Sequence, residues 1–338
     1  MNKAPFPEDT APYRAIITGT GSFAPLKVLT NDDFTRMVDT SDDWITTRTG
    51  IKVRHIAADN ESTATLATEA AKKALLDARL SAAELDLIIV ATITPEMVFP
   101  STACFVQRNL HATNAFAFDI AAACSGFVYA LEIVHQFIAA GKYKNALVIG
   151  AETLSKITNY QDRTSCILFG DAAGAAVLQR AEDGRRGVIY SRLASDGRHW
   201  KALNCQAYGS RHPANRELDD PDKKYMQIQG REVYQLAVRR IVELVTDCLE
   251  HCGLTVDDID MVVSHQMNAR IIESAAKRLC LPDEKVFINI TNYGNTSAAS
   301  IPLAFDECRK QGRIRRGDVV ILVAFGAGLT WGATIVEV

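Results

Sequence analysis

The second half of this 338-residue chain repeats the order of the motifs in its first half. Three pairs of segments carry the repeat: LSAAELDLIIV and LTVDDIDMVVS, from residues 80 and 254; FAFDIAAACSG and FINITNYGNTS, from residues 116 and 287; GKYKNALVIGAE and GRIRRGDVVILVAFG, from residues 141 and 312. GDAAGAAVL and GLTWGATIV follow in the same order. This self-similarity predicts two related βα units, each with a loop at the same structural position.

The repeat relates two polar residues that lie far apart along the chain. The segment that begins at position 116 recurs at position 287, and the segment from position 141 recurs at position 312, which is the same shift. Under that shared shift, Cys124 corresponds to Asn295. If the two halves pack about a pseudo-two-fold axis, their equivalent loops face one another. We therefore expect Cys124 and Asn295 to lie close together in the folded protein.

Strand patterns alternate with helix patterns along the chain. We expect strands at residues 14–21, 85–93, 116–121 and 145–152, and helices at residues 62–80 and 125–141. Runs of Val, Ile and Leu without polar alternation indicate strands that are covered on both faces, as in α/β proteins. A chain of this length exceeds the usual size of one hydrophobic core. We expect a tail over residues 1–12, a first half over 13–180 with Cys124, and a second half over 181–338.

The composition is that of an ordinary globular protein, with 48% hydrophobic and 23% charged residues. A net charge of −3 gives no general attraction for nucleic acid. The N-terminus lacks the apolar stretch of a secretory signal, so we expect a cytoplasmic protein. The uncharged run at residues 319–336 is long enough for a membrane span, but Gly326, Gly328 and Gly332 interrupt it. We expect two buried strands around a glycine turn and no membrane segment.

No cofactor or metal motif stands out. The eight cysteines include no CxxC pair, and we expect them to be reduced. Cys248 and Cys252 lie one helical turn apart, but no ligand-spaced His accompanies them, apart from the adjacent His251. The segment GTGSFA at residues 19–24 fits a dinucleotide fingerprint, yet Pro25 follows it and no long helix begins there. A structural turn explains that segment better.

Cys124 lies between an expected strand and an expected helix that begins near Ser125. A thiol at a helix N-terminus meets the positive end of the helix dipole and unpaired N–H groups. Both favour the thiolate, and such sites lower a cysteine pKa to roughly 3.5–7.5. We therefore expect a reactive Cys124, although a lone cysteine at such a junction is more commonly buried and inert.

His265 and Asn295 also follow expected strands. A capping histidine and a turn asparagine would explain them separately, but ligands of α/β sheets bind at the carboxyl ends of strands. A thiolate that attacks a thioester forms a new thioester, which stays activated for a second transfer. An imidazole N–H and an amide NH₂ can both donate to one enolate oxygen. Papain-like proteases also use Cys, His and Asn, but their local motifs are absent and the duplicated α/β pattern opposes them.

The motifs around these three residues are similar to those of β-ketoacyl-acyl-carrier-protein synthase III. Six segments carry the resemblance, which extends over residues 13–338: TSDDWITTRTGI, AACSGFVYAL, FGDAAGAAVL, SHQMNARI, YGNTSAASIPLA and FGAGLTWGA. The resemblance implies a thiolase-like fold, in which duplicated βα halves form a layered α-β-α-β-α sandwich. It implies a homodimer with no permanently bound cofactor, which takes acyl-coenzyme A as substrate and malonyl-acyl carrier protein as partner.

The resemblance also implies roles for individual residues. An acyl group would be carried on Cys124, with the oxyanion held by the backbone N–H groups of Cys124 and Ala327. His265 and Asn295 would stabilise the enolate that forms when the malonyl group loses carbon dioxide. The other implied residues are the coenzyme A contacts Trp44, Arg48, Arg163, Gly230, Tyr234 and Asn268, the carrier-protein patch Arg270, Lys277 and Arg278, and the acyl-pocket gate Phe99. Taken alone, Trp44 could be core, Arg163 could pair with Asp162, and Lys277 and Arg278 could form a solvated helix face.

Three positions depart from the usual motifs of this family. Ser264 replaces a usual Pro, which is expected to loosen the loop before His265. Met267 replaces a usual Ala, which adds bulk near the pantetheine path. Ala327 replaces a Gly and would be strained if its φ were positive. These departures keep open a specialised relative in secondary metabolism, with another acceptor or with acyl transfer to oxygen or nitrogen. An inactive partner subunit is a further alternative, which the intact Cys, His and Asn oppose.

Overall fold

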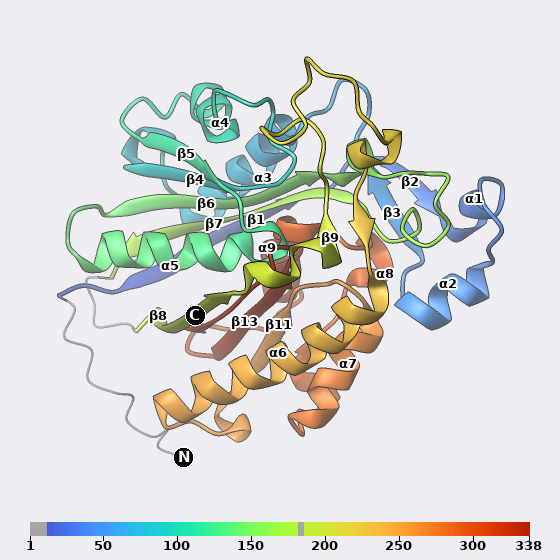
Figure 1. The fold of residues 1–338 in the computed structure, drawn as a ribbon. Coiled ribbons are helices and arrows are strands. Elements are labelled where there is room, and N and C mark those ends of the chain that lie inside the picture. Colours follow the sequence, from blue (N-terminus) through green and yellow to red (C-terminus); the bar gives the residue numbers. More distant parts are fainter. Residues whose placement is uncertain (1–11, 182–185) are drawn as a thin grey trace.

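The computed structural model describes residues 12–181 and 186–338 (Figure 1). The expected tail over residues 1–12 therefore lies almost wholly outside the described residues. Two five-stranded mixed sheets form the framework. The first has the order β1-β7-β6-β4-β5, with β1 at Ala15–Phe23, β7 at Asp171–Arg180, β6 at Asn145–Thr153, β4 at Leu87–Ala91 and β5 at Phe116–Ile120. The second has the order β8-β14-β13-β11-β12, with β8 at Val188–Ser195, β14 at Thr330–Glu337, β13 at Val319–Gly326, β11 at Met261–Ser264 and β12 at Val286–Phe287.

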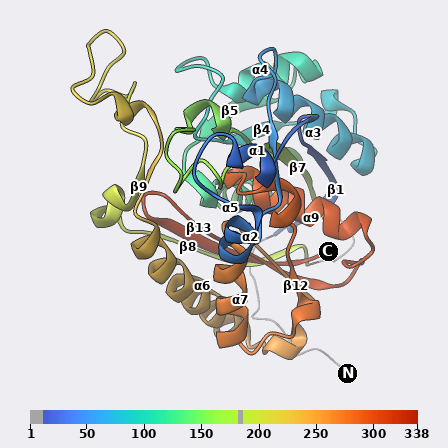
Figure 2. The ribbon, with the colours of Figure 1, turned by 90° about the vertical axis from the view of Figure 1, so that its right-hand side faces the viewer.

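Helices form three layers around these two sheets. The long helices are α3 at Thr63–Ala78, α4 at Thr102–Leu110, α5 at Gly126–Ala139, α6 at Gly230–Cys252, α7 at Ala269–Arg278 and α9 at Ser300–Lys310. Helices α3 and α4 cover the outer face of the first sheet, and α6 and α7 cover the outer face of the second. Helices α5 and α9 contact strands of both sheets and lie between them. Figure 2 shows the same layers after a quarter turn, and the expected α-β-α-β-α sandwich is confirmed.

The two sheets correspond strand by strand, with β1, β4, β5, β6 and β7 matching β8, β11, β12, β13 and β14. The central strands are buried on both faces, which is why they lack polar alternation. Residues 319–336 form β13 and β14, an antiparallel pair around a turn, as expected. Among the described residues, none of the helices is both long and apolar enough to cross a membrane.

The single shift that relates the two halves in the sequence, from 116 to 287, is wrong in detail. Leu87 pairs with Ala146 in the first sheet, and Met261 pairs with Val320 in the second. These pairs match 87 to 261 and 146 to 320, a slightly larger shift, and the starts of α5 and α9 agree with it (126 to 300). The short helix α8 at Ile290–Tyr293 has no counterpart before Cys124. Cys124 and Asn295 therefore occupy loops that correspond, but not positions that match residue for residue.

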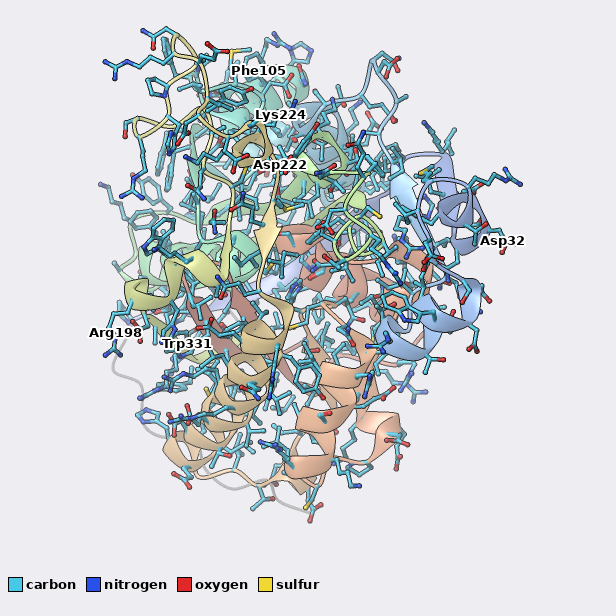
Figure 3. All side chains as sticks on the ribbon, turned by 45° about the vertical axis from the view of Figure 1, so that its right-hand side comes forward. Asp32, Phe105, Arg198, Asp222, Lys224 and Trp331 are labelled. Atoms are coloured by element: carbon cyan, nitrogen blue, oxygen red, sulfur yellow. The ribbon has the colours of Figure 1, made fainter. Side chains whose placement is uncertain are left out.

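Smaller elements lie beside the layers. The hairpin of β2 (Lys27–Thr30) and β3 (Val53–Ile56) carries the helices α1 (Asn31–Thr35) and α2 (Asp42–Thr49), at the right of Figure 1. A long arm joins β9 (Leu203–Asn204) to β10 (Gln227–Ile228), which pair with each other. Asp222 and Lys224 of this arm are labelled in Figure 3, above Trp331 of β14.

Candidate active site

A cavity of about 960 Å³ opens between the two halves. Cys124, His265 and Asn295 all line it, together with Ala327. The β9–β10 arm, the start of α6 and the segment before α4 also contribute to its lining. The structure therefore brings together the three residues that the sequence singled out, from three separate loops.

Cys124 lies in the short 3₁₀ turn Ala123–Ser125, directly before α5. Ala123 has a φ of 45°, a left-handed conformation that is uncommon for a residue with a side chain. The turn is fixed on its other side by β13, because a Cβ built on Gly326 would lie 2.7 Å from the Cys124 nitrogen. Only glycine allows this close approach of the two backbones, which holds the thiol at the cavity wall.

The thiol of Cys124 is not the low-pKa group that its place before a helix predicts. Its side chain is buried, and burial raises the pKa of Cys124 to about 12, while the nearby Ser297 hydroxyl lowers it to a lesser degree. Loss of hydration is the largest influence on this thiol, because a thiolate buried in the cavity wall has little water to solvate it. The free protein therefore carries a protonated thiol at neutral pH.

His265 follows β11, is buried and lines the cavity. Its backbone N–H donates to the Val323 carbonyl at 2.7 Å, and its Nδ1 lies 2.6 Å from Ser300 Oγ. Burial lowers the pKa of His265 to about 3, so the imidazole is neutral. Ser300 Oγ accepts from the Gln266 N–H at 3.4 Å, and we assign its own proton to Nδ1. That tautomer leaves Nε2 carrying a hydrogen.

A hydrogen bond fixes the orientation of the Asn295 side chain. Its Oδ1 accepts from the backbone N–H of Ser297 at 2.9 Å, and its main chain pairs with Leu168 and Gly170. Since the oxygen is engaged by a donor, the amide NH₂ is the group left to face the cavity. His265 and Asn295 thus offer an N–H donor each, and the cavity places both with the Cys124 sulfur.

Ala327 lies in the β13–β14 turn beside Cys124. Thr330 Oγ1 donates to the carbonyls of Ala122 and Ala327, at 3.0 Å each, and ties the turn to the Cys124 loop. The positive φ in this turn, 134°, belongs to Gly328 and not to Ala327. The replacement of Gly by Ala at position 327 therefore causes no backbone strain.

The other two departures have local explanations as well. Ser264 belongs to β11 and pairs with Val323, so the residue before His265 stays in the sheet and the expected loosening is not seen. Met267 is buried and lines the cavity, so its side chain takes up space there.

The six residues compared with coenzyme A contacts fall into two groups. Gly230, Tyr234 and Asn268 line the cavity. Trp44, Arg48 and Arg163 form a separate cluster outside it, in which the guanidinium carbons of Arg48 and Arg163 lie 4.9 and 5.3 Å from the Trp44 ring centre.

Asn268 connects the two groups, because its Nδ2 donates to the Arg48 carbonyl at 3.0 Å. Arg163 also lies 3.5 Å from Asp39, so it pairs with a different acid from the Asp162 considered in the sequence. Asn268 is thus in contact with the cluster and also lines the cavity that contains Cys124.

The remaining sequence candidates lie on the surface. Arg270, Lys277 and Arg278 are exposed on α7, the helix that also contributes Ile271 to the cavity lining. Phe99 is 82% exposed and does not line the cavity, whereas its neighbours Met97 and Val98 do.

Sequence reasoning missed a shell of buried polar residues behind the site. Ser300 holds the His265 ring, and Gln266 bonds Ser264 and Phe287 through Nε2 and the N–H groups of Asn289 and Ile290 through Oε1. Ser297 and Glu152 lie behind Cys124. Of these residues, only Gln266 gave a signal in the sequence, since it lies next to His265 inside a matched motif. Ser297 and Ser300 lie in a run of small residues, which is typical of close packing. Among the described residues, no cluster of three His, Cys, Asp or Glu side chains could hold a metal ion.

Comparisons with known proteins agree with this geometry. Residues 118–197 match the family model of 3-oxoacyl-[acyl-carrier-protein] synthase III, and residues 249–338 match the model of its C-terminal part. The β-ketoacyl-[acyl-carrier-protein] synthase III of Caldanaerobacter subterraneus is 55% identical over 95% of this chain and 97% of its own length.

Solved structures give the same result. The Aquifex aeolicus 3-oxoacyl-[acyl-carrier-protein] synthase III has a TM-score of 0.89 at 48% identity, with 96% of this chain and 100% of that chain covered. The Thermus thermophilus synthase III has a TM-score of 0.89 at 43% identity, with coverage of 96% and 99%. The fold, the motif-bearing cavity and these similarities lead to one assignment: this chain is a member of the β-ketoacyl-[acyl-carrier-protein] synthase III family of condensing enzymes.

Proposed function

We propose that this protein catalyses the decarboxylative condensation of an acyl-coenzyme A starter with malonyl-acyl carrier protein, which initiates fatty-acid synthesis. The observation that carries the proposal is the meeting of Cys124, His265 and Asn295 in one cavity. The names of its relatives support the same reaction. The secondary-metabolism alternative has no observation in its favour.

In the first step, the sulfur of Cys124 attacks the thioester carbon of acyl-coenzyme A. The tetrahedral intermediate carries a negative oxygen, which the N–H groups of Cys124 and Ala327 stabilise. Cys124 lies in the first turn of its 3₁₀ segment, where N–H groups have no partner within the helix. The coenzyme leaves as a thiol, and the acyl group remains on Cys124 as an activated thioester.

In the second step, the malonyl group enters the same cavity and loses carbon dioxide. The resulting enolate oxygen accepts from Nε2 of His265 and from the amide of Asn295. Two neutral donors suit this charge, because a buried cation would hold the enolate too stably and an acid would protonate its carbon. The enolate carbon then attacks the acyl thioester and releases the sulfur of Cys124.

The other residues that the sequence singled out supply substrate binding in this proposal. The Trp44, Arg48 and Arg163 cluster takes the adenine and phosphates of coenzyme A, and Gly230, Tyr234 and Asn268 line the path of pantetheine. The exposed cations on α7 receive the acidic carrier protein. No resident cofactor takes part. All eight cysteines are free thiols, which agrees with the reducing cytoplasm.

A homodimer completes the proposal. Strand β5 is one of the two edge strands of the first sheet, and its Phe116 is 40% exposed beside Phe118 and Tyr143. An exposed edge strand with aromatic side chains is a site for pairing with a second copy. Phe99, which is exposed in the segment before α4, would then reach the partner's acyl pocket. Sedimentation should give twice the mass of one chain, and Phe116→Asp should give one chain mass; a wild-type monomer would contradict the dimer.

The overall reaction is tested with acyl-coenzyme A and malonyl-acyl carrier protein. We expect an acyl adduct on Cys124 by intact-protein mass spectrometry, followed by release of carbon dioxide and a β-ketoacyl-carrier protein. An adduct that never leads to carbon dioxide release would defeat the proposed condensation. A mixture of acyl-coenzyme A starters in the same experiment identifies the preferred chain.

Ser300→Ala should separate the two steps. The change removes the hydroxyl at 2.6 Å from His265 Nδ1, so the ring no longer keeps its hydrogen on Nε2. We expect condensation to fall by roughly 10–100-fold, the range seen when outer partners of metal-binding histidines are removed. Loading of Cys124 should stay near the wild-type rate, and Ser300→Thr should restore condensation. Equal losses in both steps would mean that Ser300 only supports packing.

A further inference from the structure

Glu152 is a fully buried carboxyl group that the proposed reaction leaves without a task. It lies near the end of β6, with no exposed surface. Its Oε2 accepts from Thr94 Oγ1 at 2.6 Å, from Thr92 Oγ1 at 3.1 Å and from the Thr94 N–H at 3.2 Å. The Ile93 N–H donates to the same carboxyl group. Four such donors and no paired cation in the described parts of the chain form a site built to hold a carboxylate.

Ser297 lies between this carboxyl group and Cys124. Its hydroxyl is close enough to interact with both the Cys124 thiol and the Glu152 carboxyl group. Yet the buried Oγ has no well-aligned hydrogen bond among the described residues. The backbone of Ser297 has a φ of 48°, which an L-residue adopts only when its surroundings enforce it. Asn295 Oδ1 fixes it there through the Ser297 N–H.

The thiol proton needs an acceptor, and the imidazole is not suited to the task. Burial lowers the pKa of His265 to about 3, and its Nδ1 is occupied by Ser300 while Nε2 carries a hydrogen. Burial raises the pKa of Glu152 to about 7, so a large share of this carboxyl group is ionised at neutral pH. The groups that face Glu152 are hydroxyls, amide N–H groups and the Cys124 thiol, whose own pKa it raises.

We propose that Glu152 takes the proton of Cys124 through the Ser297 hydroxyl during acyl loading. This inference rests on the proposed function, because it assigns a proton path to its first step. As the bond from sulfur to the acyl carbon forms, the S–H proton moves to Ser297 Oγ, whose own proton moves to Glu152. The bond to the coenzyme sulfur then breaks. The same path returns the proton to that sulfur, and coenzyme A leaves as a thiol.

The transfer must accompany bond formation. The thiol holds its proton more tightly than the carboxyl group does, so a free thiolate is not populated beforehand. Once sulfur donates its electron pair to the acyl carbon, its affinity for the proton falls and the carboxylate can take it. Glu152 therefore acts on the sulfur through Ser297 without touching the substrate.

The test measures single-turnover loading with acyl-coenzyme A by rapid quench and mass spectrometry, between pH 5.5 and 8.5. Wild-type loading should slow as the pH falls through about 7, because Glu152 becomes protonated and can no longer accept. Glu152→Gln keeps the shape but accepts no proton. It should load roughly 10²–10⁴-fold more slowly at pH 8, the usual contribution of a general base, and lack the inflection near pH 7.

Ser297→Ala breaks the same path from its other end. It should show a comparable loss, and the double variant should load no more slowly than the slower single variant, because the two residues act as one unit. Asp171→Asn is the matched control. Asp171 is equally buried and accepts from Ala57 and Ser155, but it does not line the cavity. That variant should keep the pH inflection even if its Tm falls.

Each outcome decides the question. If Glu152→Gln is loaded at the wild-type rate and keeps the inflection near pH 7, the proton path is overturned. Additive losses in the double variant would overturn it as well. Should Glu152→Gln fail to fold, as judged by circular dichroism, a wild-type loading rate in Ser297→Ala is sufficient to overturn the proposal. A wild-type protein that forms no acyl adduct would instead defeat the proposed function. Glu152→Gln that is loaded by long incubation should still release carbon dioxide near the wild-type rate.

Discussion

Replacing Cys124 with Ala is expected to remove the acyl adduct and to lower condensation by roughly 10⁴-fold or more, as the loss of a nucleophile does elsewhere. The sulfur is the atom that carries the acyl group between the two steps, and no neighbouring side chain offers a substitute. Of the described cysteines, only Cys124 and Cys205 line the cavity, and Cys205 lies on the β9–β10 arm. Intact-protein mass spectrometry after exposure to acyl-coenzyme A measures the loss directly.

A matched cysteine variant shows whether the effect belongs to the site. Cys248 is fully buried in α6 and does not line the cavity. Cys248→Ala should load its acyl group at the wild-type rate, although it leaves a small cavity in the outer layer. An acyl adduct that persists in Cys124→Ala at the wild-type rate would place the nucleophile elsewhere and remove the basis of the mechanism.

Much of the framework was predictable because its signals are local and repeated. Buried central strands lack polar alternation, and the internal repeat predicted two related βα units, which agrees with the matching strand orders of the two sheets. The same repeat predicted that Cys124 and Asn295 lie close together. The two positions do not match residue by residue, because α8 lengthens one of the two loops. His265 was predictable because it follows a buried strand, now β11, and α/β sheets bind their ligands at the carboxyl ends of such strands.

The electrostatics of the site could not be predicted from position alone. Placement before α5 favours a thiolate, yet burial dominates and raises the pKa of Cys124. The extent of that burial depends on Gly326, which belongs to the other half of the chain and packs its backbone on the Cys124 nitrogen. In the sequence, Glu152 is only a polar residue at the end of an expected strand. The fold is needed to show that Thr92 and Thr94 donate hydrogen bonds to it.

Asn295 is expected to affect condensation far more than loading. Asn295→Ala removes one of the two donors to the enolate oxygen, and loss of one such donor costs about 10²–10³-fold in rate. Loading should fall only a few-fold. That smaller loss is expected because Asn295 Oδ1 also holds the Ser297 N–H, at 2.9 Å, and Ser297 lies beside the Cys124 thiol.

Asn295→Asp separates these two contributions. The carboxylate keeps an oxygen for the Ser297 N–H but turns an acceptor, with negative charge, toward the developing enolate. We expect condensation to fall further than in Asn295→Ala, because like charges repel in a buried cavity. Asn289→Ala is the control, since Asn289 is also buried but donates to Glu307 outside the cavity. Loading and carbon dioxide release are measured separately on each variant. Parallel losses of both steps in Asn295→Ala would show that Asn295 serves the loop around Cys124 and not the enolate.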